Sequence, residues 1–365
     1  MIDIINPSVI ENKQTERTLK FSQAINEAIS LSMAADPNVY IMGLGVPDPK
    51  GVFGTTLELQ KTFGPDRVMD MPTAENGMTG VAIGSAIVGM RPIMVHQRLD
   101  FALLAIEQIV NQAANWHYMY GGQASVPLVI RLIVGRGWGQ GPQHSQSLHS
   151  WFAHIPGLKV IMPATAYDAK GLLISSIEDN NPVIFIEHRW LHDTTGHVPD
   201  GIYKVPIGQA RVVREGKDLT IVALSHMTIE SIRAAQILAD CGIDTEIIDI
   251  RSLRPLDEQL ILQSVAKTGR LIVADTGWAN AGFSAEILAR VFEAGPNMLT
   301  MPPKRITSPQ APSPCTPGLT KFYYPRSEHI IETARAMFGF GKNNIVEASA
   351  PIAFDVPDPA FTGPF

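Results

Sequence analysis

Two cysteines, Cys241 and Cys315, are all that this 365-residue sequence contains, and they lie in separate predicted segments. Two isolated thiols exclude a disulfide framework and a cysteine-based zinc site, and they suit a reducing compartment. No apolar run reaches the roughly 18 residues of a membrane-spanning helix. The first residues also lack the basic and apolar regions of a secretion signal. We therefore expect a protein of the cytoplasm without a membrane segment.

Basic stretches are also missing from the chain. The net charge is −6 and no stripe of lysine and arginine stands out, so nucleic acid is not an expected partner. The sequence has no G-x-S-x-G nucleophile elbow and no cluster of metal-binding residues, which argues against the serine hydrolases and against a metal centre of that kind. The length is enough for two ordinary domains with sizeable cores.

Short apolar runs alternate with helical periods along the whole chain. The runs lack strict polar–apolar alternation, which is typical of parallel strands covered by helices on both faces. Strands are predicted at 39–42, 92–95, 128–134, 158–162, 183–186, 219–224, 245–250 and 271–274, and helices at 21–33, 76–88, 101–118, 167–177, 228–239, 257–267, 283–292 and 327–338. The predicted fold class is therefore α/β, with two three-layer α/β/α domains.

A polar stretch at 191–206 separates the two sets of elements and is typical of an inter-domain linker. We expect a first domain at residues 1–195, a linker at 196–206, a second domain at 207–340 and an irregular tail at 341–365. The tail is rich in proline, and Phe354, Phe361 and Phe365 could anchor it to a partner subunit.

The run 72–84 places one carboxylate, Glu75, at the start of a helix built from small residues. Gly77, Gly80 and Gly84 each cost about 1 kcal/mol relative to alanine in a helix, so close contact with a backbone or a flat ligand is expected there. The positive end of the helix dipole favours an ionised carboxylate. Taken alone, a role in capping the helix is the favoured interpretation, with ligand binding as the alternative.

His144 ends a glycine-rich loop that follows the predicted strand 128–134. Loops at strand ends of α/β sheets are where ligands bind, and histidine exchanges protons near neutral pH. The alternative is that His144 or Ser145 only caps the next helix. The loop does not match the phosphate-binding P-loop pattern, and His149 and His154 on the following helix are interpreted as structural.

Phe101 begins the predicted helix 101–118 and admits two interpretations. Its ring could stack on a flat ligand. Its helical spacing with other apolar residues is more typical of a core aromatic. On spacing alone we interpret it as a core residue.

Taken together, these segments resemble the β subunit of the thiamine-diphosphate-dependent 2-oxoacid dehydrogenases of the pyruvate, branched-chain and acetoin types. The resemblance runs from about Thr18 to Phe338. The motifs that carry it are G-V-F-G-T-T at 51–56, P-T-A-E-N-G-M-T-G at 72–80, A-I-E-Q-I-V-N-Q-A-A at 105–114, Y-M-Y-G-G-Q at 118–123, Q-H-S-Q at 143–146, F-A-H-I-P-G-L-K-V at 152–160, D-A-K-G-L-L at 168–173, I-E-D-N-N-P at 177–182 and D-I-R-S-L-R-P-L-D at 249–257. It implies a transketolase-like pyrimidine-binding domain followed by a transketolase C-terminal domain.

The resemblance also implies a shared cofactor site. The β subunit of the family holds the aminopyrimidine of thiamine diphosphate, and an α subunit with the signature G-D-G followed by N-N holds the diphosphate through Mg²⁺. This chain contains no G-D-G. The expectation is an α₂β₂ heterotetramer that is inactive as a single chain and that transfers its acyl group to a lipoyl acyltransferase.

Roles for individual residues follow from the same resemblance. Glu75 matches the carboxylate that activates the cofactor, and His144 matches the active-site histidine of the H-S-Q motif. Phe101 matches the aromatic near the aminopyrimidine, with Gln97 and Leu99 beside it. The carbonyl of Ser176, together with Asp179 and Asn181, matches a potassium site that some members carry.

Departures from the family pattern concern the substrate. Arg98 and Arg136 introduce cations near the expected ring pocket and in the loop before His144. They are compatible with an anionic substrate, and so with a second interpretation: the β half of a split transketolase-like carboligase that uses an aldehyde acceptor. A non-catalytic regulatory homologue is a third interpretation, and the presence of both Glu75 and His144 argues against it.

Overall fold

The computed structural model describes residues 17–137 and 139–340, which form two compact units. The first unit contains the described residues up to Val134 together with residues 154–207. The second contains the segment 135–153 together with the described residues from Gly208 onward. The loop that carries His144 therefore belongs, by its contacts, to the second unit, although the strand that precedes it belongs to the first.

A parallel sheet forms the centre of the first unit. Its strands run in the order β6-β7-β5-β4-β2-β3, and every neighbouring pair in that series is parallel. All residues of β2, β5 and β7 are buried, which confirms the prediction from their continuous apolar runs. The strands are β2 (Val39–Gly43), β3 (Val68–Met69), β4 (Arg91–His96), β5 (Val129–Val134), β6 (Lys159–Ile161) and β7 (Val183–His188).

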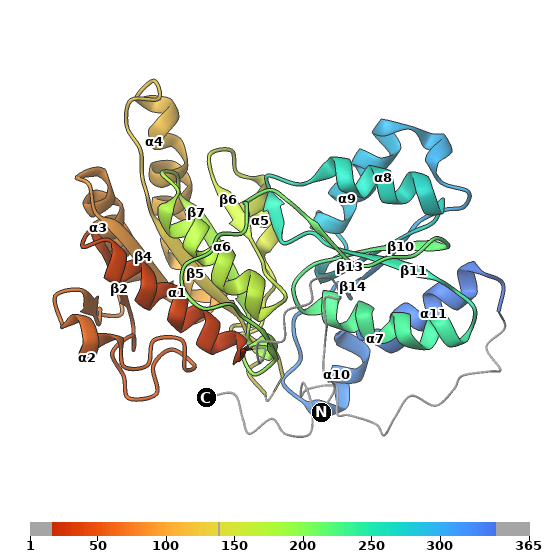
Figure 1. Ribbon diagram of the computed structural model, residues 1–365, viewed down its shortest axis with the longest axis horizontal. Helices are drawn as coiled ribbons and strands as arrows, with labels where there is room; N and C mark the ends of the chain where they lie inside the picture. The colour runs from red at the N-terminus through yellow and green to blue at the C-terminus, as the bar shows by residue number, and fades with distance from the viewer. Residues whose placement is uncertain (1–16, 138, 341–365) are drawn as a thin grey trace. The chain divides into compact units, whose positions relative to one another are not determined.

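Helices pack against this sheet and bury its apolar side chains. α1 (Phe21–Ala35) and α6 (Ala166–Glu178) lie side by side, and α3 (Glu75–Ile87) packs against β4 (Figure 1). A short antiparallel pair is added by β1 (Thr18–Lys20) and β8 (Thr195–His197). This unit also contains α2 (Leu59–Phe63), η1 (Leu99–Ala105), η2 (Gln108–Ala113), α4 (Ala114–Met119) and the 3₁₀-helix η3 (Arg189–Leu191).

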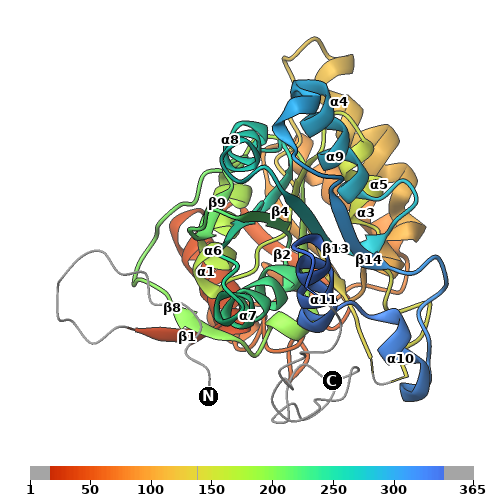
Figure 2. The same cartoon turned by 90° about the vertical axis from the view of Figure 1, so that its right-hand side faces the viewer.

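The second unit has its own mainly parallel sheet, with strand order β14-β13-β10-β11-β9. Its strands β13 and β14 are parallel neighbours (Figure 2). The antiparallel neighbour is the edge strand β9. Helices α7 and α11 pack against each other, and an apolar core fills the space between them and the sheet. The strands are β9 (Arg211–Arg214), β10 (Leu219–Ala223), β11 (Thr245–Asp249), β13 (Leu271–Trp278) and β14 (Lys304–Ser308). The helices are α5 (His149–His154), α7 (His226–Asp240), α8 (Glu258–Thr268), α9 (Phe283–Ala294), η4 (Pro296–Met298), α10 (Pro317–Tyr323) and α11 (Ser327–Met337), and β12 (Ser252–Arg254) follows β11.

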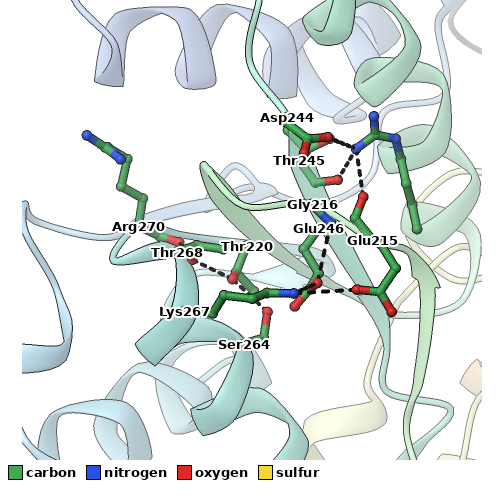
Figure 3. Close-up of polar contacts among 11 residues, drawn as sticks. Glu215, Gly216, Thr220, Asp244, Thr245, Glu246, Ser264, Lys267, Thr268 and Arg270 are labelled. Carbon is green, nitrogen blue, oxygen red and sulfur yellow. Dashed lines mark hydrogen bonds and ion pairs between the residues drawn. The ribbon is translucent and has the colours of Figure 1, made fainter.

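Polar contacts fasten α8 to the amino ends of β10 and β11 (Figure 3). The buried Thr220 hydroxyl lies 2.7 Å from the hydroxyls of both Ser264 and Thr268. Lys267 forms an ion pair with Glu246 in the same region. Ligands bind at the carboxyl ends of strands in parallel sheets. We therefore interpret these contacts at the amino ends as stabilising the second unit and not as part of a binding site.

The predicted single helix 101–118 is wrong in detail. A 3₁₀-helix, η1 (Leu99–Ala105), is followed by a π-helical turn, η2 (Gln108–Ala113), and then by α4. The Asn115 side-chain amide donates to the Val110 carbonyl at 3.1 Å, which ties the start of α4 to η2. The apolar spacing alone does not distinguish these helix types.

The predicted linker is not irregular throughout, because β8 lies within the stretch 191–206. Its three residues are exposed or half-buried, so no apolar run marks them as a strand. Phe354, Phe361 and Phe365, which we predict to anchor the tail, lie outside the described residues.

Candidate active site

Glu75 is the first residue of α3, and Ala74 before it supplies no side-chain cap. Glu75 is only 7% exposed. Among the residues that the structure describes, none donates a hydrogen bond to its carboxylate or forms an ion pair with it. The carboxylate oxygens keep some contact with solvent, so they can receive a donor from a ligand or from another chain.

The small residues of α3 face different surroundings. A Cβ added at Gly80 would lie 3.4 Å from the Gln108 side-chain oxygen, whereas Cβ atoms at Gly77 and Gly84 would meet no other atom within 4 Å. The Gln108 amide also donates to Asn76 at 3.0 Å, which ties the first turn of α3 to η2. One glycine therefore lies against a neighbour in this chain, and two leave open space.

The segment after β4 carries the residues predicted to lie beside a ring. η1 packs against α3, so the half-buried Phe101 lies on an element adjacent to that of Glu75. The Gln97 side-chain amide donates to the Leu44 carbonyl at 2.8 Å, and Leu99 is fully buried. The structure thus brings the elements of these four residues together, while their roles toward a cofactor stay predictions.

Two guanidinium groups flank the ring of Phe53 in the first unit. Arg98 lies 4.6 Å and Arg189 lies 4.9 Å from the ring centroid, and both residues are buried. Burial lowers the pKa of Arg98 to about 10, and the like charge of Arg189 acts in the same direction. The contribution of Arg189 could not be found from the sequence, because no local motif links it to Phe53.

His96 lies beneath the first turns of α3 and was not singled out from the sequence. Its Nε2 lies 3.3 Å from the Thr79 hydroxyl, and Thr79 follows Glu75 by one helical turn. Burial lowers the pKa of His96 to about 4, so the imidazole is neutral at pH 7. It therefore supports α3 without adding a charge close to Glu75.

A buried ion pair joins β5 to β7. Arg131 donates to Glu187 at 2.6 and 3.0 Å, and both side chains are fully buried. His192 lies 3.1 Å from the second Glu187 oxygen. Burial alone would raise the pKa of Glu187, but the charge of Arg131 and the contact with His192 hold it at about 2. The pair is fixed and ionised near neutral pH.

The loop that carries His144 is held by residues of the second unit. At its start, the Arg136 guanidinium lies 4.3 Å from the ring centroid of Tyr324, whose hydroxyl accepts from the Gly137 N–H at 3.4 Å. Near its middle, the Ser313 hydroxyl donates to the Ser145 carbonyl at 3.4 Å. His144 is half-buried between these anchors.

The end of the same loop meets a buried contact between a histidine and a carboxylate. His149, the first residue of α5, has its Nε2 2.9 Å from an Asp275 oxygen, and both side chains are fully buried. Burial alone would raise the pKa of Asp275, yet the charge and contact of His149 and two backbone donors hold it below its usual range. The prediction of a structural His149 did not foresee this partner, because the two residues lie far apart in the sequence.

The residues of the predicted potassium site already have partners in the first unit. The Asp179 carboxylate forms an ion pair with Lys159 and accepts from the Asn181 N–H at 2.9 Å, and the Ser176 carbonyl accepts from the Asp179 N–H at 3.3 Å. The Arg91 guanidinium donates to the Asp179 carbonyl at 3.1 Å. A potassium ion would compete here with two protein cations, and the site stays a prediction.

Two features are lacking within residues 17–137 and 139–340. Neither range contains a helix long and apolar enough to cross a membrane. The same ranges hold no cluster of three or more histidine, cysteine or acidic residues placed to bind a metal ion.

Comparisons with known proteins match both units. The transketolase pyrimidine-binding domain matches residues 17–193, and the transketolase C-terminal domain matches residues 208–330. The "Acetoin:2,6-dichlorophenolindophenol oxidoreductase subunit beta" of Cupriavidus necator is 42% identical over 337 residues, which cover 90% of this chain and 99% of that relative. The protein of the same name from Bacillus subtilis is 39% identical over 88% of this chain and 98% of the relative.

A plant relative and a solved structure extend the comparison. The "Pyruvate dehydrogenase E1 component subunit beta-1, mitochondrial" of Oryza sativa subsp. japonica is 40% identical over 86% of this chain and 85% of that protein. The solved structure "Split gene transketolase, inactive beta4 tetramer" has a TM-score of 0.71 at 21% identity and covers 88% of this chain and 99% of its own. At that identity the likeness shows the two-domain fold alone.

Proposed function

The chain belongs to the family of acetoin and pyruvate dehydrogenase β subunits, with its transketolase-like pyrimidine-binding and C-terminal domains, and from this we propose its function. It is the β subunit of a heteromeric thiamine-diphosphate-dependent 2-oxoacid dehydrogenase. The assembled enzyme decarboxylates a 2-oxoacid and transfers the acyl group to a lipoyl carrier. The free cysteines, Cys241 and Cys315, support a reducing compartment such as the cytoplasm.

The observation that carries this proposal is Glu75 itself: the residue is largely buried at the start of α3, and its carboxylate has no donor among the described residues. It fits a ring nitrogen that shares a proton with it, and the aminopyrimidine of thiamine diphosphate has such a nitrogen. When bound, the cofactor supplies the carbon nucleophile and the electron sink. Glu75 contributes a carboxylate that holds the shared proton, and Phe101 contributes an aromatic wall on the adjacent element.

A second chain is needed to complete the site. The sequence lacks G-D-G, so we assign the diphosphate and its Mg²⁺ to an α subunit in an α₂β₂ heterotetramer. The open space at Gly77 and Gly84 and the exposed Val81 and Val88 support α3 as part of a subunit contact. Val88 directly follows α3 and is 80% exposed.

We assign His144 to the transfer of the acyl group. Its imidazole is half-buried on an anchored loop, so it is accessible and yet held in place. A histidine can give or accept a proton near neutral pH, and transfer of an acyl group to a thiol carrier requires such a proton exchange. The acceptor that fits this role is the lipoyl arm of an acyltransferase.

A split transketolase-like carboligase is the second candidate. The observation that favours it is the pair of buried guanidinium groups at Arg98 and Arg189, which would attract an anionic substrate. In that case the acceptor is an aldehyde and no lipoyl carrier takes part.

One reconstitution distinguishes these proposals. The chain is purified alone and with an α subunit that carries G-D-G and N-N, and both preparations are assayed for 2-oxoacid-dependent dye reduction, lipoyl-domain acylation and aldehyde condensation. The proposed function predicts dye reduction and acylation by the complex and neither by the single chain. Turnover by the single chain would disprove the shared site, and condensation without acylation would establish the carboligase instead.

A further inference from the structure

We propose that the buried His149–Asp275 pair positions the loop that carries His144. The inference rests on the proposed function, because it takes His144 as the residue whose placement matters. The pair touches no reacting atom in this account, so both members are positioning residues. The sequence assigned His149 only a general structural role.

Asp275 is an anchor point on the second unit. It lies on β13, it is fully buried, and its carboxylate accepts from the Gly277 N–H at 2.7 Å and from the Ser284 N–H at 3.2 Å. Ser284 lies in the first turn of α9, so the carboxylate joins the end of a strand to the start of a helix. Its position is therefore fixed by the backbone before His149 is considered.

His149 is fastened to that anchor at the far end of the loop. Its Nε2 lies 2.9 Å from Asp275, and a Cβ added at Gly277 would lie 3.1 Å from the His149 ring. A side chain at position 277 would therefore crowd the imidazole, and glycine leaves room for it. One residue further, the Ser150 hydroxyl accepts from the Phe283 N–H at 2.9 Å.

The loop has little rigidity of its own. Gly137, Gly139 and Gly141 all adopt positive φ angles, between +65° and +76°, a region open to glycine at no steric cost. A chain of this kind keeps its shape through contacts with its surroundings: at its start through Arg136, at Ser145 through the Ser313 hydroxyl, and at its far end through His149. Release of the His149 end removes the anchor that follows Ser145, which loosens the segment that carries the His144 imidazole.

Loss of the pair is expected to lower turnover more than it lowers binding. A misplaced catalytic group loses effective concentration at the reacting centre, and a shift of about 1 Å can cost up to about a hundredfold in rate. Cofactor affinity depends on the residues of the first unit around the proposed ring site and on the α subunit, which the pair does not touch. A change in kcat with an unchanged KM and an unchanged thiamine diphosphate affinity is the expected signature.

A double-mutant cycle in the reconstituted α₂β₂ complex tests the inference. His149→Gln and Asp275→Asn are each made in the wild-type background and in a His144→Ala background, and lipoyl-domain acylation is measured. We expect each to lower kcat about tenfold or more with His144 present, and less than about twofold in the His144→Ala background. His154→Gln, an exposed residue at the end of the same short helix, is the matched control and should retain full activity.

The outcomes separate the inference from the function on which it rests. Additive losses in the two backgrounds, or no loss at all, would overturn the positioning role. Normal acylation by His144→Ala would instead remove His144 from the proposed mechanism. Asp275→Asn keeps the size of the side chain and one carbonyl acceptor. The double-mutant cycle can therefore be completed with this variant alone if His149→Gln fails to fold. Hydrogen exchange of residues 139–147 gives a second readout, expected to rise in both variants and to stay unchanged in His154→Gln.

Discussion

Replacing Arg131 with methionine should destabilise the first unit strongly, because it leaves a charge buried without its partner. Glu187 is fully buried and receives two hydrogen bonds from Arg131, at 2.6 and 3.0 Å. The same guanidinium donates to the Thr55 hydroxyl at 3.0 Å. The variant removes all three contacts, and His192 remains as the other polar side chain within reach of the carboxylate.

The expected cost can be estimated in two ways. Removing one partner of a buried ion pair typically costs about 3–5 kcal/mol. The pKa of Glu187 falls from its ordinary value of 4.5 to about 2 in the folded protein. At about 1.4 kcal/mol per pKa unit, that difference corresponds to roughly 3 kcal/mol of stability. Because the folded-state pKa is the lower one, this stability is fully present above about pH 4.5 and is lost as the pH falls toward 2.

Denaturant unfolding at pH 7 measures the change in the free energy of unfolding for Arg131→Met. Lys61→Met is the control, because Lys61 pairs with Glu58 on an exposed surface and should cost less than about 1 kcal/mol. Repeating the measurement near pH 3 should narrow the difference between Arg131→Met and the wild type. A cost below about 1 kcal/mol at pH 7, or a difference that does not depend on pH, would refute the reasoning.

Two further predictions concern the fold of each unit. Gly157→Ala should destabilise the first unit by roughly 3 kcal/mol or more, since φ is +90° and the new Cβ would lie 2.0 Å from the Ala114 carbonyl oxygen. Gly64→Ala, at φ +82° with open space around it, should cost only about 1–2 kcal/mol, and equal costs in thermal or denaturant unfolding would contradict the clash. Thr220→Val in the second unit should cost about 1–3 kcal/mol, because it removes the hydroxyl that Ser264 contacts at 2.7 Å. An unchanged unfolding midpoint for that variant would show that the buried hydroxyls find other partners.

The buried strands of the sheets were predictable from the sequence, whereas a short strand without buried residues was not. Continuous apolar runs identified β5 and β7 because both strands are buried on both faces, a pattern that alternation would not produce. β8 has three residues, none of them buried, so its pairing with β1 follows from the path of the chain rather than from composition. The π turn of η2 has the same apolar content as an α-helix and differs only in hydrogen bonding.

The candidate site also combines features that the sequence predicts with features that only the folded chain reveals. Glu75 was found because it starts a helix of small residues and lies within a family motif, but its missing partner is visible only in three dimensions. The pairing of His149 with Asp275 and the stacking of Arg189 on Phe53 join residues that are far apart in the sequence. Contacts of this kind depend on the topology of the chain, and no local spacing encodes them.

The measurement that tests the central proposal most directly is turnover by Glu75→Gln in the reconstituted complex. Glutamine keeps the size of the side chain but cannot hold the shared proton. We therefore expect thiamine diphosphate to bind within a few-fold of normal while 2-oxoacid-dependent dye reduction falls by about 10²–10⁴-fold. Glu58→Gln, at an exposed position of the same unit, is the control and should match the wild type. Dye reduction by Glu75→Gln close to the wild-type rate would contradict the assignment of Glu75 and with it the proposed cofactor site.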